Sequence, residues 1–316
     1  MFTALEKKMI DNCIRIDLDL TGLCNRTCRF CPRYDDLIYP NVNKHMSMEV
    51  IDEVIRQMEL VGFDDFVELA GRGEPTLHPE FHEVLDKLNK PGRTWKLRVT
   101  TNCHKLEEHW DHMSEVLDDI ILNTYTTREE HEERLKKYPR LKNGKLCQQY
   151  FKPDGLTPEE MNKSESFILV SDMDKPADKR PTFHWTFNNR AGTFNENFKE
   201  GGCWHPMRQI FINYEGKYQM CCNDWTYQIE IGDILERDLF EMYCHDPKLN
   251  RIRWQLVNGR RSAIKPCSMC DDQQGLGKKM QGTYDRFRQA DTYRQIVCPA
   301  SIKGKQYDEQ LRNEGR

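Results

Sequence analysis

Three cysteines near the N-terminus have the spacing of a metal site. Cys24, Cys28 and Cys31 form the pattern C-x3-C-x2-C in the loop after a predicted strand at residues 14–24. Sites in α/β proteins form where parallel strands end, so this placement favours a functional role. Three thiolates can hold three irons of a 4Fe-4S cluster and leave the fourth iron open to a ligand. A zinc knuckle and a group of buried thiols are the alternatives, but structural zinc usually has four protein ligands, and no fourth lies nearby.

A second group of cysteines lies in the C-terminal third, at positions 203, 221, 267 and 270. Four thiolates fully ligate an iron–sulfur cluster, and they also make a tetrahedral zinc site. Cys222 competes with Cys221 as the ligand from that segment. The chain has 13 cysteines, and the odd number with close spacings speaks against a disulfide framework. Five others have no assigned role beyond packing, or hydrogen-atom donation for one of them: Cys13, Cys103, Cys147, Cys244 and Cys298.

Alternating strand and helix patterns must position the first group. Apolar residues at helical spacing predict a helix over residues 46–61, with Ser47 as its N-cap. A glycine-rich turn ends the predicted strand at residues 63–75. This alternation predicts a parallel sheet or open barrel, followed by a β-hairpin that turns at residues 215–216. Further strands are predicted at residues 96–102, 118–125 and 181–192, and further helices at 78–90, 128–137, 236–244 and 248–259.

The first cysteine group resembles the signature of the radical S-adenosylmethionine (SAM) superfamily, in which an aromatic residue, here Phe30, precedes the third cysteine. The similarity implies that Cys24, Cys28 and Cys31 hold the catalytic cluster and that SAM binds its open iron. The family's "GGEP" motif, which receives the SAM amino group, is matched by Gly71, Arg72, Gly73, Glu74 and Pro75. Arg72 replaces the usual glycine, and we expect the role of the motif to be intact.

Other strand-end residues match the family's SAM contacts. Thr101 and Asn102 stand where relatives carry "TNG", with Cys103 replacing the glycine. Asn123 ends the next predicted strand, where a polar residue often lies near the SAM ribose or carboxylate. Arg190 stands where related enzymes place an arginine near the carboxylate. Each of these side chains could instead satisfy backbone groups where a strand ends.

The second group resembles the SPASM/twitch extension of the same superfamily. The pattern Cys203-x12-Gly216-x4-Cys221, followed by Cys267-x2-Cys270, is similar to its first auxiliary cluster site. Only Cys298 follows Cys270, which favours the shorter twitch form with one auxiliary cluster. The resemblance implies an α/β fold: a partial (β/α)6 parallel barrel over residues 1–195, a small cluster-binding domain of β-hairpin and α-helices at 196–275, and a polar helical tail at 276–316.

The function implied by the resemblance is reductive cleavage of SAM to a 5′-deoxyadenosyl radical, which abstracts a hydrogen atom from a substrate. A reductant such as flavodoxin or ferredoxin would supply the electron. We expect such an oxidoreductase or maturase to oxidise, epimerise or cross-link its substrate. The substrate would be a peptide or a sugar- or aminocyclitol-type small molecule. Residues 125–180 exceed an ordinary crossover, and we expect them to select the substrate. The alternative class is an iron–sulfur or zinc protein without catalysis.

The composition of the chain limits the classes of partner that it can bind. Charged residues make up 31% of the 316 residues and the net charge is −4, so the chain lacks the basic excess of a general nucleic-acid binder. No apolar run approaches the ~20 residues that span a bilayer, and no secretory signal precedes the first strand. We therefore expect a cytoplasmic protein.

Overall fold

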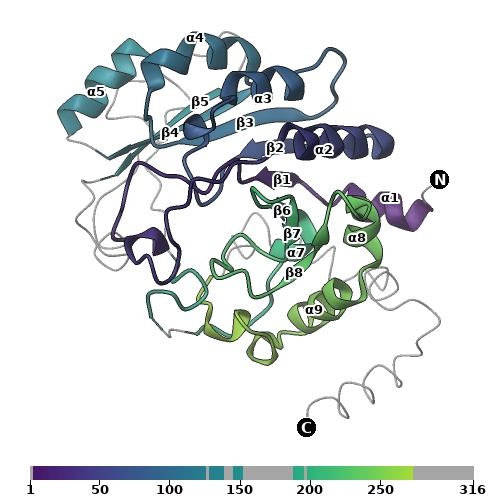
Figure 1. Cartoon of the computed structure of the whole chain (residues 1–316). Coiled ribbons are helices and arrows are strands. Elements are labelled where there is room, and N and C mark those ends of the chain that lie inside the picture. Colours follow the sequence, from purple (N-terminus) through teal and green to yellow (C-terminus); the bar gives the residue numbers. More distant parts are fainter. Residues whose placement is uncertain (1–2, 126–127, 139–144, 152–187, 196–197, 273–316) are drawn as a thin grey trace, which may run out of the picture.

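The fold is built on one sheet, taken from a computed structural model that describes residues 3–125, 128–138, 145–151, 188–195 and 198–272. Its eight strands pair in the order β5-β4-β3-β2-β1-β6-β7-β8 (Figure 1). The six strands from β5 to β6 run parallel, whereas β7 and β8 continue the sheet antiparallel. The strands are β1 (Arg15–Leu18), β2 (Phe66–Leu69), β3 (Lys96–Thr101), β4 (Asp119–Tyr125), β5 (Lys145–Phe151), β6 (Gln209–Ile212), β7 (Lys217–Gln219) and β8 (Glu230–Asp233).

Helices connect the parallel strands and cover one face of the sheet. The helices α2, α3 and α4 lie side by side, and α8 packs beside α2, as Figure 1 shows. The α-helices are α1 (Ala4–Ile10), α2 (Met48–Val61), α3 (Phe81–Leu88), α4 (Leu106–Val116), α5 (Arg128–Lys137), α7 (His205–Arg208), α8 (Leu239–His245) and α9 (Pro247–Val257). The 3-10 turns are η1 (Pro32–Tyr34), η2 (Pro75–Leu77), η4 (Arg261–Ala263) and η5 (Cys267–Met269). No helix of the described residues is both long and apolar enough to span a bilayer.

The two faces of the sheet differ in chemistry. Side chains on the helix-covered face are fully buried and apolar: Ile16, Leu18, Val67, Leu69, Leu97, Val99, Ile120, Leu122, Ile210 and Ile212. The opposite, inner face carries a row of charges at matched register, Asp17, Glu68, Arg98 and Asp119. Arg98 Nη2 lies 2.7 Å from Asp119 Oδ2, which pairs two members of the row. Apolar burial therefore fixes the sheet against its helices and leaves a polar face for a site.

Most of the predicted elements are present where the structure describes the chain. Helix α2 follows Ser47, whose Oγ accepts a hydrogen bond from Val50 N–H at 3.3 Å. The hairpin of β6 and β7 turns at Gly216, whose φ of 77° is readily adopted only by glycine. The predicted α/β class with a mostly parallel sheet is confirmed.

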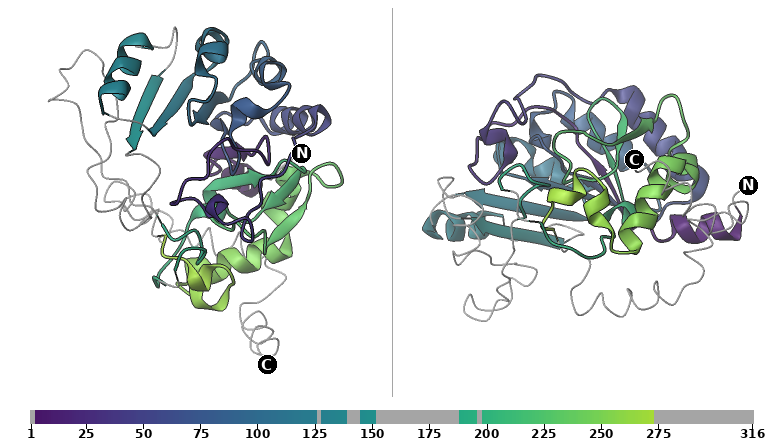
Figure 2. Two further views of the ribbon diagram at one scale, coloured as in Figure 1. Left: turned by 60° about the vertical axis from the view of Figure 1, so that its left-hand side comes forward. Right: turned by 90° about the horizontal axis from the view of Figure 1, so that it is seen from below.

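The structure also departs from the sequence-based expectation. The sequence patterns did not predict β5, β8 or α1, and they assigned β6 to a separate domain. In the structure β6 pairs parallel with β1, so the hairpin extends the barrel sheet. Figure 2 shows β6 to β8 in green beside the purple N-terminal strand. Most of the predicted strand at 181–192, most of the 125–180 stretch and the tail at 276–316 lie outside the described residues, and the domain boundaries stay predictions.

Removing apolar volume beneath β1 should destabilise the whole sheet, because β1 has a neighbour on each side. Ile16 is 0% exposed, and Ile16→Ala should lower the free energy of unfolding by about 2–5 kcal/mol. Chemical denaturation of the metal-free chain measures this change. Leu60→Ala, at a side chain that is 63% exposed, is the matched control and should change stability by at most about 0.5 kcal/mol.

Candidate functional site

The loop that follows β1 gathers the first three cysteines. Cys31 N–H donates to Cys28 C=O at 2.9 Å, and Cys24 N–H donates to Asn41 Oδ1 at 2.9 Å. Burial raises the pKa of Tyr125 well above its usual value, and all three thiols raise it further. All three thiols therefore lie in the electrostatic surroundings of one ring.

Tyr125, at the end of β4, forms a wall beside this loop. Phe30, the aromatic residue of the signature, stacks on its ring with centroids 5.7 Å apart and planes 22° apart. The guanidinium of Arg26 lies 4.6 Å from the centroid of the same ring. Phe30 and Cys28 are both buried. These contacts fix the loop against the carboxyl end of the sheet and shield it from water.

The loop at residues 71–75, after β2, packs tightly against the loop after β1. Asp19 Oδ1 accepts hydrogen bonds from the N–H groups of Arg72 at 3.0 Å and Gly73 at 3.2 Å. A Cβ on Gly71 would overlap the Asp19 carboxylate, and one on Gly73 would overlap the Thr21 carbonyl oxygen. Both glycines are therefore required by close approach of the backbone.

Glu74 is a buried carboxylate that joins two strand ends. Its Oε1 accepts from Thr101 Oγ1 at 2.6 Å and Thr76 Oγ1 at 2.8 Å, and its Oε2 accepts from Asn102 N–H at 2.7 Å. Burial raises the pKa of Glu74, whereas these hydrogen bonds lower it. A carboxylate oxygen can accept two hydrogen bonds, so Oε2 can accept a further one, such as from the ammonium that the motif is expected to bind. Pro75 begins η2 directly after it.

Asn102 connects this carboxylate to the cysteine loop. Its Nδ2 lies 2.9 Å from Asn25 Oδ1 and 3.6 Å from Cys24 Sγ. Cys103 adopts a φ of 68°, the conformation that explains the glycine expected there. Its thiol contacts the Asn123 carbonyl oxygen at 3.6 Å.

Two predicted SAM contacts have buried polar atoms that suit a ligand. Within the described residues, Asn123 Oδ1 and Arg190 Nε have no hydrogen-bond partner. A buried polar group without a partner costs free energy, so a polar ligand at these atoms would remove that cost. The three thiols, the Glu74 carboxylate and these two atoms thus fit a cluster with SAM bound to it.

The structure also brings together the second group of cysteines. Burial raises the pKa of Cys270 to about 11, and the thiol of Cys203 adds to the shift. Burial raises the pKa of Cys267 too, with Cys203 and Cys270 adding to it. The pKa of Cys221 is raised by its hydrogen bond with Cys222 and by burial, and Cys203 adds to the rise. The Asn223 N–H donates to Cys221 Sγ at 3.4 Å, and the Asp272 N–H donates to Cys270 Sγ at 3.4 Å. Three buried thiols and the half-buried thiol of Cys221, two of them with N–H donors, are the residue types that hold an iron–sulfur cluster.

Metal identity at this second group is open on geometry alone. No set of three or more His, Cys, Asp or Glu side chains in the described ranges is arranged to hold a single metal ion. A hydrogen bond with Cys221 lowers the pKa of Cys222, and the charges of His205 and Arg15 lower it further. The assignment of Cys221 as the ligand therefore stays a prediction, as does the choice between a cluster and zinc.

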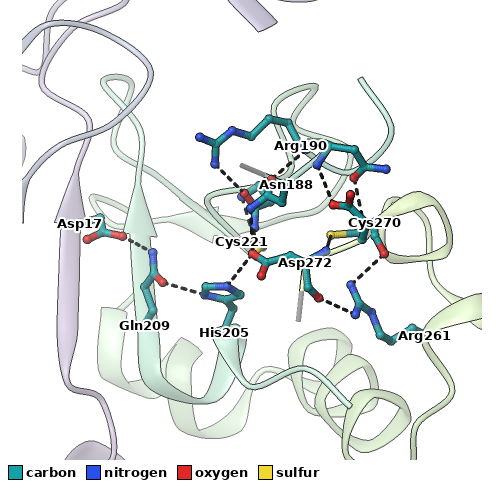
Figure 3. A network of polar contacts seen from close by, with 12 residues as sticks. Asp17, Asn188, Arg190, His205, Gln209, Cys221, Arg261, Cys270 and Asp272 are labelled. Carbon is teal, nitrogen blue, oxygen red and sulfur yellow. Dashed lines mark hydrogen bonds and ion pairs between the residues drawn. The ribbon is translucent and has the colours of Figure 1, made fainter. Parts of the chain in front are cut away.

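Asp272 is the centre of a polar network around these thiols (Figure 3). Its Oδ2 accepts from Asn223 Nδ2 at 2.6 Å and Asn188 Nδ2 at 3.0 Å, and His205 Nε2 lies 3.1 Å away. Burial disfavours the charged imidazole, but the hydrogen bond to Asp272 raises the pKa of His205 to about 10. His205 Nδ1 lies 3.1 Å from Gln209 Oε1. The amide of Gln209 donates to Asp17 on β1, so the network reaches the inner face of the sheet.

Arg190 lies between the two cysteine groups. Its Nη1 donates to Asn223 Oδ1 at 3.3 Å, beside the second group (Figure 3). Burial raises the pKa of Cys31, in the first group, to about 11, and the charge of Arg190 opposes this rise. The sequence predicted only a SAM contact for Arg190, and the contact with Asn223 is additional.

Family profiles match both parts of the chain. The profile of the radical SAM superfamily matches residues 18–148, and that of SPASM, an iron-sulfur cluster-binding domain, matches residues 203–271. Residues 18–148 therefore form a radical SAM domain, and residues 203–271 form a SPASM domain. Such a chain uses a 4Fe-4S cluster with SAM, and its SPASM domain implies auxiliary iron–sulfur binding.

Solved structures share the fold. BtrN in complex with AdoMet (SAM) and 2-DOIA has a TM-score of 0.60 and 16% identity, covering 82% of this chain and 93% of that chain. SuiB of Streptococcus suis bound to precursor peptide SuiA has a TM-score of 0.51 and 13% identity, covering 81% of this chain and 69% of that chain. Identities this low show the fold alone.

A curated relative matches a shorter stretch. GTP 3',8-cyclase of Actinobacillus pleuropneumoniae serotype 3 (strain JL03) is 29% identical over 100 residues, which is 31% of this chain and 28% of the cyclase. The match thus spans less than a third of that relative's length.

Several residues that shape the site were not predicted from the sequence. Asp19 and Asn41 each fix the backbone of a loop that carries predicted ligands, and the Asp272 carboxylate joins side chains around the second cysteine group. Asp19 carried a local signal, because it is a carboxylate between two leucines where the strand ends. The other two act through contacts with distant segments, which no spacing pattern reveals.

Protonation of Asp19 should make stability depend on pH. Burial raises its pKa from 3.8 to about 6, although Arg72 opposes the shift. The folded chain therefore binds this proton more tightly than the unfolded chain, and the resulting stabilisation is complete below pH 3.8 and is lost as pH rises through 6. The loss amounts to at most about 3 kcal/mol. Denaturation of the metal-free chain between pH 4 and pH 7 should show this fall for wild type, and Asp19→Asn should lack it; parallel profiles would contradict the assignment.

Proposed function

We propose that this chain is a radical SAM oxidoreductase that removes a hydrogen atom from a small polar substrate. The bound cluster and SAM would supply a 5′-deoxyadenosyl radical after one-electron reduction by a flavodoxin- or ferredoxin-type partner. The second cluster would accept the remaining electron of a two-electron oxidation, and the matching proton would pass to a base or to water.

One observation carries this proposal. Asn102 contacts Cys24 Sγ through its side chain and Glu74 through its backbone N–H. The motif residues of two different strands are thus assembled on the thiol that would hold the cluster. A protein that only stored a cluster or zinc would not need this arrangement of carboxylate and amide groups.

The residues divide the work of the site between binding and exclusion of water. Glu74 would accept the ammonium of SAM, while Asn123 and Arg190 would bind its polar ribose and carboxylate groups. Phe30 and Tyr125 stack at the side of the cysteine loop and would keep water from a reactive radical. Arg190 also reaches Asn223, so a substrate near it would lie between the two cysteine groups.

The inner face of the sheet supports a small polar substrate. Arg15 Nη1 lies 3.2 Å from Glu68 Oε2, and Glu68 Oε1 accepts from Thr100 Oγ1 at 2.7 Å. Such a charged and hydroxyl-bearing face suits a sugar- or aminocyclitol-type molecule more than an apolar side chain. The fold shared with BtrN in complex with AdoMet and 2-DOIA supports the same class. A peptide is the second candidate, supported by the fold shared with SuiB bound to precursor peptide SuiA.

Metal content and SAM cleavage test the proposal together. Anaerobically reconstituted wild type should contain about eight irons, and the Cys24→Ala/Cys28→Ala/Cys31→Ala variant about four. With dithionite and SAM, wild type should form 5′-deoxyadenosine and the variant none. Iron and sulfide analysis, Mössbauer spectra and chromatography of the nucleoside measure these outcomes.

Replacing Cys267 and Cys270 with alanine is the matched control. This variant should also keep about four irons, and it should retain cleavage of SAM without turnover of substrate. About four irons in wild type together with zinc would leave the SAM site in place and make the second group a zinc site. Binding of SAM without any 5′-deoxyadenosine would reject the enzymatic function.

A further inference from the structure

Arg72 departs from the motif in which it lies, and its side chain is only 3% exposed. Both sides of its backbone are held: its N–H donates to Asp19 Oδ1 at 3.0 Å, and its carbonyl accepts from Arg33 Nη1 at 3.1 Å. The direction of the side chain is therefore set by the loop. A buried guanidinium is costly unless other groups compensate its charge.

Four aromatic rings surround this guanidinium. Its carbon lies 4.0 Å from the ring centroid of Tyr227, 4.8 Å from that of Phe211, 5.5 Å from that of Trp225 and 5.7 Å from that of Tyr39. Rings at these distances attract a cation through their π faces. The hydroxyls of Tyr39 and Tyr227 lie 3.0 Å apart, which closes one side of this aromatic cage.

The cage joins three segments that carry or follow predicted ligands. Tyr39 lies in the loop after the first cysteine group, Phe211 on β6, and Trp225 and Tyr227 in the segment at residues 221–229, called here the second-site loop. Arg72 Nη2 donates to the Asp224 carbonyl oxygen at 2.5 Å. Asp224 N–H in turn donates to the Cys221 carbonyl oxygen at 3.2 Å. Two hydrogen bonds thus connect the SAM-binding motif to a proposed ligand of the second cluster.

The second-site loop is also closed on itself around Asp224. Its carbonyl oxygen accepts from Tyr227 N–H at 3.2 Å, and its Oδ2 accepts from Ile229 N–H at 2.9 Å. A shift of Cys221 would therefore move the Asp224 carbonyl, which Arg72 binds, and the rings of Trp225 and Tyr227. Such a shift would be transmitted to residues 71–75, because Gly71 and Gly73 leave that loop no free space against Asp19 and Thr21.

We propose that Arg72 is a positioning residue that couples SAM affinity to occupancy of the second cluster site. A cluster on the second group holds the second-site loop in place, and Arg72 then holds residues 71–75 in the geometry that binds SAM. By thermodynamic linkage, SAM stabilises the second site by the same factor. The inference rests on the proposed function and adds a regulatory connection to it.

A double-mutant cycle on SAM affinity tests the coupling. Wild type, Cys267→Ala/Cys270→Ala, Arg72→Gly and the combined variant are reconstituted anaerobically, and their iron content confirms that the first cluster is present. Equilibrium dialysis with labelled SAM gives each Kd. Loss of the second cluster should weaken SAM binding about tenfold when Arg72 is present. The same loss should change the Kd by no more than about twofold in the Arg72→Gly background. Arg72→Gly restores the residue usual in the motif, so a merely tolerated arginine would leave the tenfold effect unchanged.

Two further measurements separate coupling from a general loss of structure. Hydrogen exchange of residues 221–229 should become faster in Arg72→Gly and should be partly restored by Arg72→Lys, which keeps a cation in the cage but loses the planar fork. Arg93→Gly is the control variant. Arg93 lies before β3, at the opposite end of the parallel strands, where its Nη2 lies 2.7 Å from Asp118 Oδ2. Its removal should leave the coupling between SAM affinity and the second cluster site intact.

The outcomes distinguish this inference from the proposed function. Equal loss of SAM affinity with and without Arg72, while wild type binds SAM tightly, would overturn the coupling alone. Wild type that carries the first cluster but binds no SAM would overturn both. If Arg72→Gly fails to take up iron, the same cycle is measured with Arg72→Lys. The positioning role of Arg72 would be rejected if this variant showed the coupling of wild type and unchanged hydrogen exchange at residues 221–229.

Discussion

The parallel pairing of β6 with β1 is the constraint on which the rest of the structure depends. It places the SPASM hairpin at the edge of the barrel sheet, so that the inner faces of both parts form one surface. Gln209 on β6 can then donate to Asp17 on β1, and Phe211 can face the guanidinium of Arg72. Without this pairing, the two cysteine groups would belong to independent domains with no fixed relation. With it, the contacts of Arg190 and Arg72 bridge a short space between them.

Burial of charge is the recurring cost in this arrangement. Asp17, Asp19, Glu74 and Arg72 are all at most 5% exposed. Burial raises the pKa of Asp17 to about 8 despite its pairing with Arg15. Such groups reduce stability compared with apolar residues of similar volume, yet they fix loop geometry through directional hydrogen bonds. A site that must hold SAM and two metal centres in one orientation gains from that geometry. The apolar face beneath the helices supplies the compensating free energy.

The sequence predicted the parts of the fold that depend on local pattern. The helix at 46–61 and the hairpin at Gly216 follow from spacing within a few residues, and the structure contains both. The two cysteine groups were also found from local spacing, and their role as ligands stays a prediction. The strand β8 was missed because EIGD is short and contains a glycine, and β5 because KLCQQYF has no clear apolar alternation. The pairing of β6 with β1 and the cage around Arg72 arise from contacts between distant segments, so no local pattern could indicate them. The sequence showed Arg72 only as a departure from a motif.

The same strand pairing bears on the order in which the protein assembles. Asp17 and Gln209 are 192 positions apart, whereas β1 to β4 join neighbours through single helical crossovers. Closing so long a loop carries a larger entropic cost than forming successive local units, and contacts of high sequence separation form slowly. The half of the sheet that bears the first cysteine group can therefore form before the C-terminal third has been synthesised. The second group is complete only after the last thiols, at Cys267 and Cys270, have joined it, so metal loading of this chain should proceed from the N-terminal to the C-terminal site.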